Sequence, residues 1–302
     1  MKHLQDGSSL VPLPGGFSGE TFLAESMGER TVVRIYVQRG ARRGLEAVEV
    51  DAAVLRLVRG LLPVPEVLEV RRPDPSAGTP ALLVTSFLPG ERLDSVLPRM
   101  SDAVRAAAGT NLGRLLGRLA QMPMLRPGRF VDGHLTVQPW TEGADLVSWV
   151  ESQRSTSALA GWPPDEYAAL LVVTDQAQTL LERLTRVSLV HSDLNPKNVL
   201  VDPATGAVTG LVDWEFCHAG MPVADLGNLL RFDREPMFAQ AVLDSYRRTC
   251  PDAGDAVLDR ARAADMYALV DLAGRRGENP VTESAHQLLV AVARSGDLHA
   301  VP

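Results

Sequence analysis

Carboxylate and amide side chains are concentrated in one stretch of the chain, residues 191–198 (His-Ser-Asp-Leu-Asn-Pro-Lys-Asn), and two further acids follow in Asp213-Trp214-Glu215. Transfer of a phosphoryl group from a nucleotide needs a carboxylate that receives or orients the attacking hydroxyl. It also needs oxygen ligands that hold magnesium beside the polyphosphate. Asp193 supplies the first, and Asn198 with Asp213 supply the second. The residue types and their order predict a magnesium-dependent phosphoryl-transfer centre.

The segment between the two metal-ligand candidates predicts a β-hairpin. Residues 199–201 and 208–212 are short β-rich runs, and the turn-forming sequence Asp-Pro-Ala-Thr-Gly at 202–206 joins them. A hairpin folds the chain back on itself, so Asn198 and Asp213 should lie side by side at its open end, where they would share a metal ion. The alternative is purely structural: a capped turn beside an edge hairpin.

This ordered set resembles the aminoglycoside phosphotransferase family, whose pattern His-x-Asp-x-x-x-x-Asn followed by an Asp is met at Asp193, Asn198 and Asp213. The resemblance implies an α+β, protein-kinase-like bilobal fold. A small N-lobe over residues 1–88 would hold an antiparallel sheet with one helix, and a larger, mostly helical C-lobe would span residues 89–302. It also implies Mg²⁺ as cofactor and ATP or GTP as co-substrate.

The order of expected elements agrees with such a fold. Four β-rich runs and one helical pattern around residues 50–58 precede Pro89-Gly90, and helical patterns dominate afterwards. The runs are Thr21–Ala24, Thr31–Val37, Val67–Val70 and Ala81–Phe87. The later helices are expected from Ser101 to about Leu119, from Pro164 to about Leu184, and near Val223–Phe232, Pro236–Tyr246, Ala256–Leu272 and Thr282–Ala293. The Pro- and Gly-rich segment Met122–Thr141 predicts a loop.

Two segments of the N-lobe are assigned to the nucleotide. Glycines permit a tight turn whose backbone N–H groups approach phosphates, and the resemblance implies such a loop at Gly15, Gly16, Phe17, Ser18 and Gly19. The segment Leu83–Gly90 resembles the family's hinge, in which backbone groups near Ser86 and Leu88 would hydrogen-bond the base. Backbone contacts leave the choice between ATP and GTP open.

Arg34 is the main departure from the protein-kinase pattern, because that pattern places a lysine on the third strand, paired with a helix glutamate. Arginine keeps the positive charge and adds a planar fork of donors. By resemblance, Asp51 matches the acidic position that would pair with Arg34, and Glu49 and Glu46 are the alternatives.

The remaining candidates support the centre. His191 is expected to bond backbone within the loop, and Asn195 to bind the acceptor or magnesium. Glu215 would bind an amino group of the acceptor or form a salt bridge. Asp225 matches a family position that braces the catalytic loop, and an N-cap carboxylate is the alternative role.

Composition limits the class of protein. The chain has 302 residues, 45% hydrophobic and 22% charged, with a net charge of −7 that argues against nucleic acid as a partner. Two cysteines are too few for a disulfide framework or a zinc site. No apolar run reaches the roughly 20 residues that span a bilayer, and residues 1–7 lack the apolar core of a signal peptide. A cytoplasmic protein without a membrane partner is expected, and its oligomeric state is left open.

The short distance from Glu215 to Asp225 decides the substrate class. Nine residues lie between them, too few for the activation segment of a protein kinase. We therefore expect the acceptor to be a hydroxyl group of a small molecule. Residues 91–302 contain 27 acidic and 20 basic side chains, and this acidic excess favours a cationic acceptor, such as an amine-bearing natural product or antibiotic. The alternatives are a choline-, homoserine- or sugar-kinase-like enzyme and a nucleotide-binding pseudokinase. A metal-dependent hydrolase using His191, Asp193 and Asp213 is a further alternative, but these residues do not make a convincing set of three ligands.

Overall fold

The computed structural model describes residues 9–13, 21–26, 28–37, 43–140 and 145–302, and the chain divides into two compact units. Unit 1 comprises Met1–Ala108, Arg129–Gln138 and Pro196–Cys217, and unit 2 comprises Gly109–Gly128, Pro139–Asn195 and His218–Pro302. The chain thus crosses between the units several times. The lobe boundary near residue 88 stays a prediction.

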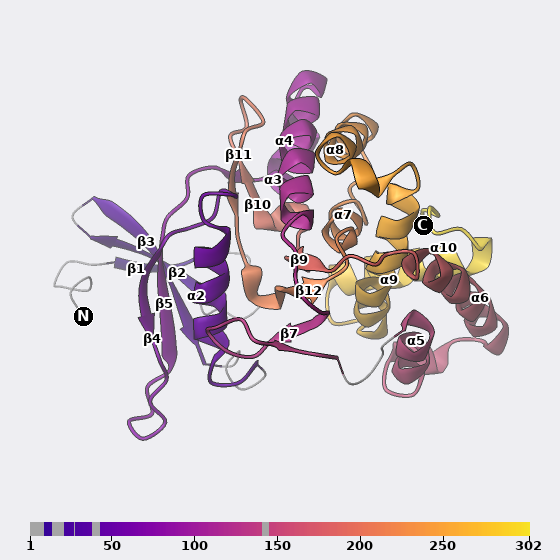
Figure 1. Ribbon diagram of the computed structural model, residues 1–302, viewed down its shortest axis with the longest axis horizontal. Coiled ribbons are helices and arrows are strands. Elements are labelled where there is room, and N and C mark those ends of the chain that lie inside the picture. The colour runs from indigo at the N-terminus through magenta and orange to yellow at the C-terminus, as the bar shows by residue number, and fades with distance from the viewer. Residues whose placement is uncertain (1–8, 14–20, 27, 38–42, 141–144) are drawn as a thin grey trace. The chain divides into compact units, whose positions relative to one another are not determined.

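Unit 1 contains a five-stranded antiparallel sheet in the order β1-β2-β3-β5-β4 (Figure 1). The strands are β1 (Ser9–Pro12), β2 (Thr21–Ser26), β3 (Glu29–Tyr36), β4 (Val67–Arg71) and β5 (Ala81–Ser86). The four β-rich runs of the sequence correspond to β2, β3, β4 and β5. The predicted small antiparallel sheet is therefore confirmed.

The two faces of this sheet have different partners. On one face Ala24, Val33 and Val84 form a buried apolar cluster. Because side chains alternate along a strand, Arg34 and Tyr36 of β3 point to the other face, where Tyr36 contacts helix α2 (Ala47–Val58). Figure 1 shows α2 lying against the sheet. The position of Arg34 is thus set by the pleat of β3.

A second sheet of unit 1 carries the predicted hairpin. Strands β10 (Val199–Val201) and β11 (Val208–Leu211) pair antiparallel, and β6 (Glu91–Arg92) adds to β10. Gly90 precedes β6 with φ +127°, and a Cβ there would lie 2.4 Å from Thr209 Oγ1. Only glycine allows the chain to pass this close to the hairpin.

Short elements complete unit 1. They are α3 (Leu93–Val96) and the 3-10 turns η1 (Leu97–Arg99), η3 (Pro196–Asn198) and η4 (Trp214–Phe216). The segment expected to be a loop, Met122–Thr141, instead contains two paired strands, β7 (Gly128–Phe130) and β8 (Val137–Gln138). Strands of two and three residues are too short to leave an alternating pattern in the sequence.

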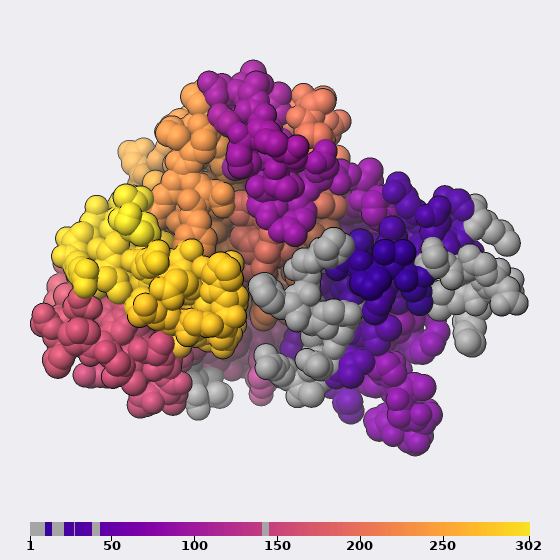
Figure 2. Space-filling view, turned by 180° about the vertical axis from the view of Figure 1, so that it is seen from behind, coloured from indigo at the N-terminus to yellow at the C-terminus, as the bar shows by residue number. Residues whose placement is uncertain are grey.

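Helices dominate unit 2, as the sequence predicts. They are α4 (Asp102–Ala120, which begins in unit 1), α5 (Leu146–Arg154), η2 (Ala158–Gly161), α6 (Pro164–Leu181), α7 (Ala224–Leu229), α8 (Pro236–Thr249), η5 (Pro251–Ala253), α9 (Val257–Gly274) and α10 (Pro280–Ser295). In Figure 2 the yellow atoms of the C-terminal helices lie beside the pink atoms of α5 and α6. Helix α5 was not predicted. Its Trp149 donates from Nε1 to the carbonyl of Tyr267 on α9 at 3.1 Å.

Helices α4 and α8 pack closely because α4 presents glycine to α8. A Cβ on Gly113 would lie 2.2 Å from the carbonyl oxygen of Val242, and one on Gly109 would lie 2.6 Å from that of Phe238. The pair of strands β9 (Ser188–Val190) and β12 (His218–Gly220) forms the other framework of unit 2, with His218 opposite Val190. Across the described residues, every helix is too short or too polar to cross a membrane.

Candidate active site

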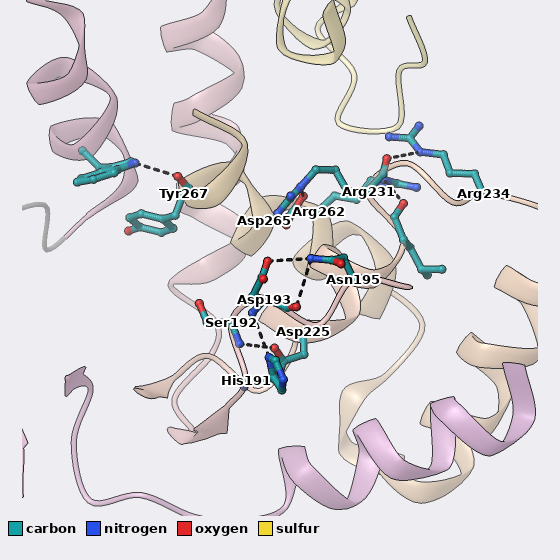
Figure 3. A network of polar contacts seen from close by, with 12 residues as sticks. His191, Ser192, Asp193, Asn195, Asp225, Arg231, Arg234, Arg262, Asp265 and Tyr267 are labelled. Atoms are coloured by element: carbon teal, nitrogen blue, oxygen red, sulfur yellow. Dashed lines mark hydrogen bonds and ion pairs between the residues drawn. The ribbon is translucent and has the colours of Figure 1, made fainter. Parts of the chain in front are cut away.

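A buried carboxylate fixes the loop that follows β9 in unit 2. The backbone N–H groups of His191 and Ser192 donate to Oδ2 and Oδ1 of Asp225, at 2.8 and 2.7 Å (Figure 3). Ser192 has φ +68°, a conformation that non-glycine residues rarely adopt. The two hydrogen bonds hold this unusual turn in place, which is the geometry that a brace of the loop requires.

The charge of Asp225 is opposed by its surroundings. The residue is 3% exposed and lies in the first turn of α7. Burial raises the pKa of its carboxyl above the usual range, while His191 and the two N–H donors act in the opposite direction. The two N–H donors and His191 therefore offset only part of the cost of burying this carboxylate.

Asp193 is oriented by its neighbours in the same loop. Asn195 donates from Nδ2 to Asp193 Oδ1 at 2.8 Å, and its backbone N–H donates to the Asp193 carbonyl at 2.9 Å (Figure 3). The Asp193 N–H donates to His191 Nδ1 at 3.3 Å, and His191 itself is fully buried. The Asp193 side chain is half-buried, and the hydrogen bond from Asn195 orients its carboxylate, as a group that positions a hydroxyl needs.

A buried ion pair between Arg231 and Asp265 lies near this loop, and the sequence did not predict it. Arg231 donates from Nε and Nη2 to Asp265 of α9 at 2.8 and 2.6 Å, and the two residues are 5% and 7% exposed (Figure 3). Burial opposes the charge of Arg231, but Asp265 and, more weakly, Asp193 raise its pKa above the ordinary value. Arg231 thus places a permanent positive charge in the electrostatic environment of Asp193.

In unit 1 the hairpin brings the two metal-ligand candidates to one end. Val199 pairs with Leu211, and the N–H of Val212 donates to the carbonyl of Asn198 at 3.0 Å. Asn198 therefore lies directly before β10 and Asp213 lies shortly after β11, both at the open end of the hairpin. Asp213 has φ +66°, again a left-handed conformation in a non-glycine residue. Such local strain is typical of functional positions.

The donor set fits magnesium. Among the described residues, three His, Cys, Asp or Glu side chains nowhere cluster in a way that would hold a metal ion unaided. Mg²⁺ in nucleotide enzymes is commonly held by one or two protein oxygen ligands together with substrate phosphates and water. One amide and one carboxylate at the end of a hairpin match that requirement.

Arg34 points from β3 to Asp213. Its guanidinium forms an ion pair with Asp213 Oδ1, and the two side chains are 16% and 23% exposed. Burial opposes the charge, but Asp213 and Asp51 hold the pKa of Arg34 above its ordinary value. The pair is shielded from water and is therefore stronger than an exposed surface pair.

Asp51, which the sequence predicted as the partner of Arg34, is instead bound by two other residues. Arg43 donates to Oδ1 at 2.6 Å and to Oδ2 at 2.9 Å, and the Tyr36 hydroxyl donates to Oδ2 at 2.7 Å. Asp51 is 3% exposed. Burial, and next the neighbouring Asp51 charge, raise the pKa of Tyr36, so its hydroxyl remains a donor. The expected pairing differs because Arg43 reaches the carboxylate with both guanidinium nitrogens.

The other acids near Arg34 have separate roles. Glu49 accepts a hydrogen bond from Arg72 Nε at 2.6 Å, and Glu46 precedes α2 and is fully exposed to solvent. Glu215, in η4, raises the pKa values of both Arg34 and Arg43 by its charge. Both roles considered for Glu215, binding of an acceptor amino group and a salt bridge, stay predictions.

The hinge candidates lie at the end of β5. Ser86 is engaged with Glu66: its N–H donates to the Glu66 carbonyl and its Oγ accepts from the Glu66 N–H, both at 2.9 Å. Leu88 is half-buried and lies beside Gly210 of β11. The predicted glycine loop, Gly15, Gly16, Phe17, Ser18 and Gly19, lies outside the described residues.

Sequence reasoning missed four residues of these networks: Tyr36, Arg43, Arg231 and Asp265. Tyr36 had a usable signal, because it is two residues after Arg34 and therefore shares its face of β3. The other three had none. Arginine is frequent in this chain, and no spacing rule distinguishes a buried arginine from an exposed one.

Comparison with known proteins places these sites in context. The model of the phosphotransferase enzyme family (APH) matches residues 9–263. An aminoglycoside 3′-phosphotransferase from Streptomyces ribosidificus is 29% identical over 199 residues, which are 63% of this chain and 68% of that relative. The family match therefore covers both units.

Solved structures have the same fold. The GDP complex of wild-type aminoglycoside 2′-phosphotransferase-IIIa aligns with a TM-score of 0.73 at 17% identity, over 96% of this chain and 93% of that one. A thermostable mutant of aminoglycoside phosphotransferase APH(4)-Ia, in a ternary complex with ADP and hygromycin B, aligns with a TM-score of 0.68 at 19% identity, over 95% and 94%. These likenesses confirm the predicted α+β fold class.

Proposed function

The chain belongs to the phosphotransferase enzyme family, and on this premise we propose that it transfers the γ-phosphoryl group of ATP or GTP to a hydroxyl group of a small molecule, with Mg²⁺ as cofactor. The observation that carries the proposal is the β10–β11 hairpin, which brings the Asn198 amide and the Asp213 carboxylate to one end. A neutral and a charged oxygen ligand so placed would suit Mg²⁺, which would lower the negative charge of the nucleotide phosphates.

Asp193 is proposed to act on the acceptor. In the reaction the acceptor oxygen bonds to the γ-phosphorus, the bond from that phosphorus to the β–γ bridging oxygen breaks, and the nucleoside diphosphate leaves. The Asp193 carboxylate orients the attacking hydroxyl and receives its proton. The hydrogen bond from Asn195 to Oδ1 orients the carboxylate for this contact.

Charge neutralisation is proposed for the nucleotide side. Asn198 and Asp213 would hold Mg²⁺, and the bound ion would offset the negative charge of the phosphates. Arg34, whose pKa is raised and which therefore stays protonated, supplies a planar donor fork for phosphate oxygens. Asp225 keeps residues 191–195, the acceptor-side loop, in the left-handed turn at Ser192.

The acceptor is proposed to be a cationic, amine-bearing natural product of the antibiotic type. Two observations support this class. The relatives named above are aminoglycoside phosphotransferases, and the acidic excess of this chain lies in residues 91–302. A field of negative charge raises the local concentration of a cationic acceptor.

The test is a search for phosphorylated product. Purified protein, Mg²⁺ and ATP or GTP are mixed with a panel of hydroxylated amines that includes several antibiotic classes, and mass spectrometry follows the gain of one phosphoryl group. Asp193→Ala should form product about 10³-fold more slowly, and Asp175→Ala, an exposed acid on α6 of the same unit, should behave as wild type. Product formation by Asp193→Ala at the wild-type rate would contradict the proposed role.

A further inference from the structure

We infer that Arg43, which no motif marks, is a positioning residue of the nucleotide side: it saturates Asp51 and thereby leaves Arg34 on Asp213, where Arg34 is a counter-ion that the metal must displace. The inference rests on the proposed function, because it takes Asp213 as a metal ligand. In the protein-kinase pattern one lysine both pairs with an acidic residue and binds phosphates. Here Arg43 would pair with the acidic residue and Arg34 would bind the phosphates.

The first step is the saturation of Asp51. Its two carboxylate oxygens accept two hydrogen bonds from the fork of Arg43 and one from the Tyr36 hydroxyl, within 2.6 to 2.9 Å. A carboxylate offers about four acceptor positions, and the Asp51 side chain is only 4% exposed. A second guanidinium fork therefore has no complete set of acceptors there.

The second step is the choice that this imposes on Arg34. Asp51 is close enough to raise the pKa of Arg34, and so is Glu215, yet the direct ion pair is with Asp213. Tyr36 shares the strand face of Arg34 and binds Asp51. Without Arg43, Asp51 would be a buried carboxylate that lacks a cation, close enough to Arg34 to affect its pKa. Arg43 removes this competitor.

The third step concerns the metal. Arg34 and a divalent cation both require the Asp213 carboxylate, so each lowers the apparent affinity of the other for it. The side chains of Arg34 and Asp213 are 16% and 23% exposed, so the pair is only partly screened by water. Arg34, once released from Asp213, would have its guanidinium fork available to phosphate oxygens.

The test measures metal binding without nucleotide and without turnover. Mn²⁺ alone is titrated into the full-length protein, and free Mn²⁺ is followed by electron paramagnetic resonance. Arg34→Gln should bind Mn²⁺ more tightly by about tenfold, since a hydrogen-bonded charge is removed from the ligand. Arg43→Gln should also bind more tightly, because the released Asp51 draws Arg34 away from Asp213.

A double variant separates positioning from simple charge repulsion. If Arg43 acts only through Arg34, then adding Arg43→Gln to Arg34→Gln brings no further tightening. Additive tightening would overturn the positioning role. Arg43→Lys, which keeps the charge but not the planar fork, should lie between wild type and Arg43→Gln. Arg71→Gln on β4, which removes a charge paired with Glu69 on the surface, should leave Mn²⁺ affinity unchanged.

Asp213→Asn distinguishes this inference from the function on which it rests. It should weaken Mn²⁺ binding strongly. If it does not, Asp213 is no metal ligand, and both the metal site of the proposed function and the inference fail. If it does, but Arg34→Gln binds Mn²⁺ no more tightly than wild type, the inference alone fails. Thermal unfolding of each variant checks that the fold is kept.

Discussion

The acceptor-side loop of unit 2 and the ion-pair cluster of unit 1 are built on opposite principles. The loop is held by one buried carboxylate, Asp225, that accepts two backbone N–H groups. The cluster comprises Arg34, Arg43, Asp51, Asp213 and Glu215, in which two cations and three acids have alternative partners. A bond to the backbone has no substitute, whereas ion pairs can exchange. The loop is therefore preorganised, and the cluster can change partners, as binding of the proposed metal and nucleotide would require.

The largest expected effect separates the two regions by kinetics. Asp193→Ala should lower kcat by about 10³-fold, because a positioned proton acceptor contributes about 10² to 10⁴, and should leave nucleotide affinity nearly unchanged. Arg34→Gln should instead raise the KM for nucleotide. Steady-state kinetics with the identified acceptor measure both. Equal changes in the KM for nucleotide in the two variants would contradict the assignment of Asp193 to the acceptor and of Arg34 to the nucleotide.

Stability should distinguish a fixed ion pair from an exchangeable one. Asp265→Asn leaves the buried Arg231 without its carboxylate, which should reduce the free energy of unfolding by about 3–5 kcal/mol. Asp213→Asn should cost less than Asp265→Asn, because the side chains of Arg34 and Asp213 are 16% and 23% exposed and Glu215 remains a neighbouring negative charge. Guanidinium chloride unfolding measures both. A comparable loss in the two variants would contradict exchangeability.

Removal of the brace tests the preorganisation of the loop. Asp225→Ala leaves the N–H groups of His191 and Ser192 without their acceptor, at a cost of about 1–3 kcal/mol for each buried group. Loosening the loop should lower kcat by about 10²-fold. The KM for nucleotide should stay unchanged, since the cluster is untouched. A variant with wild-type kcat would show that the left-handed turn at Ser192 persists unaided.

The smallest expected effect is a pH dependence of stability. Because burial raises the pKa of Asp225 in the folded state, its stabilising contribution is full below the unfolded value of about 3.9 and declines as pH rises through the folded value. The difference in free energy of unfolding between wild type and Asp225→Ala should therefore shrink as pH rises above about 4. Urea unfolding across this range measures it, and a growing difference would contradict the sign. Arg34 and Arg43, whose pKa values are raised above that of free arginine, add no slope in this window.

Local features of the fold were predictable because they depend on neighbours in sequence. The hairpin could be predicted from its turn, where Asp202 accepts from the N–H of Ala204 at 2.8 Å and Gly206 has φ +70°. The β-rich runs and most helices followed from periodicity. The strands β7 and β8 and the helix α5 were missed because they are short or weakly patterned.

The order of Asp193, Asn198 and Asp213 in the sequence was enough to indicate the chemistry, since a hairpin of that length must bring the last two residues to one end. The sequence also placed Arg34 on a strand, because the pleat follows from alternation. Only the tertiary structure decided which carboxylate each arginine pairs with. Arg34 pairs with Asp213, 179 residues away, and Arg231 with Asp265, 34 residues away. Which carboxylate an arginine binds depends on competition among charges that only folding brings together. The spacing of residues in the sequence therefore cannot predict it.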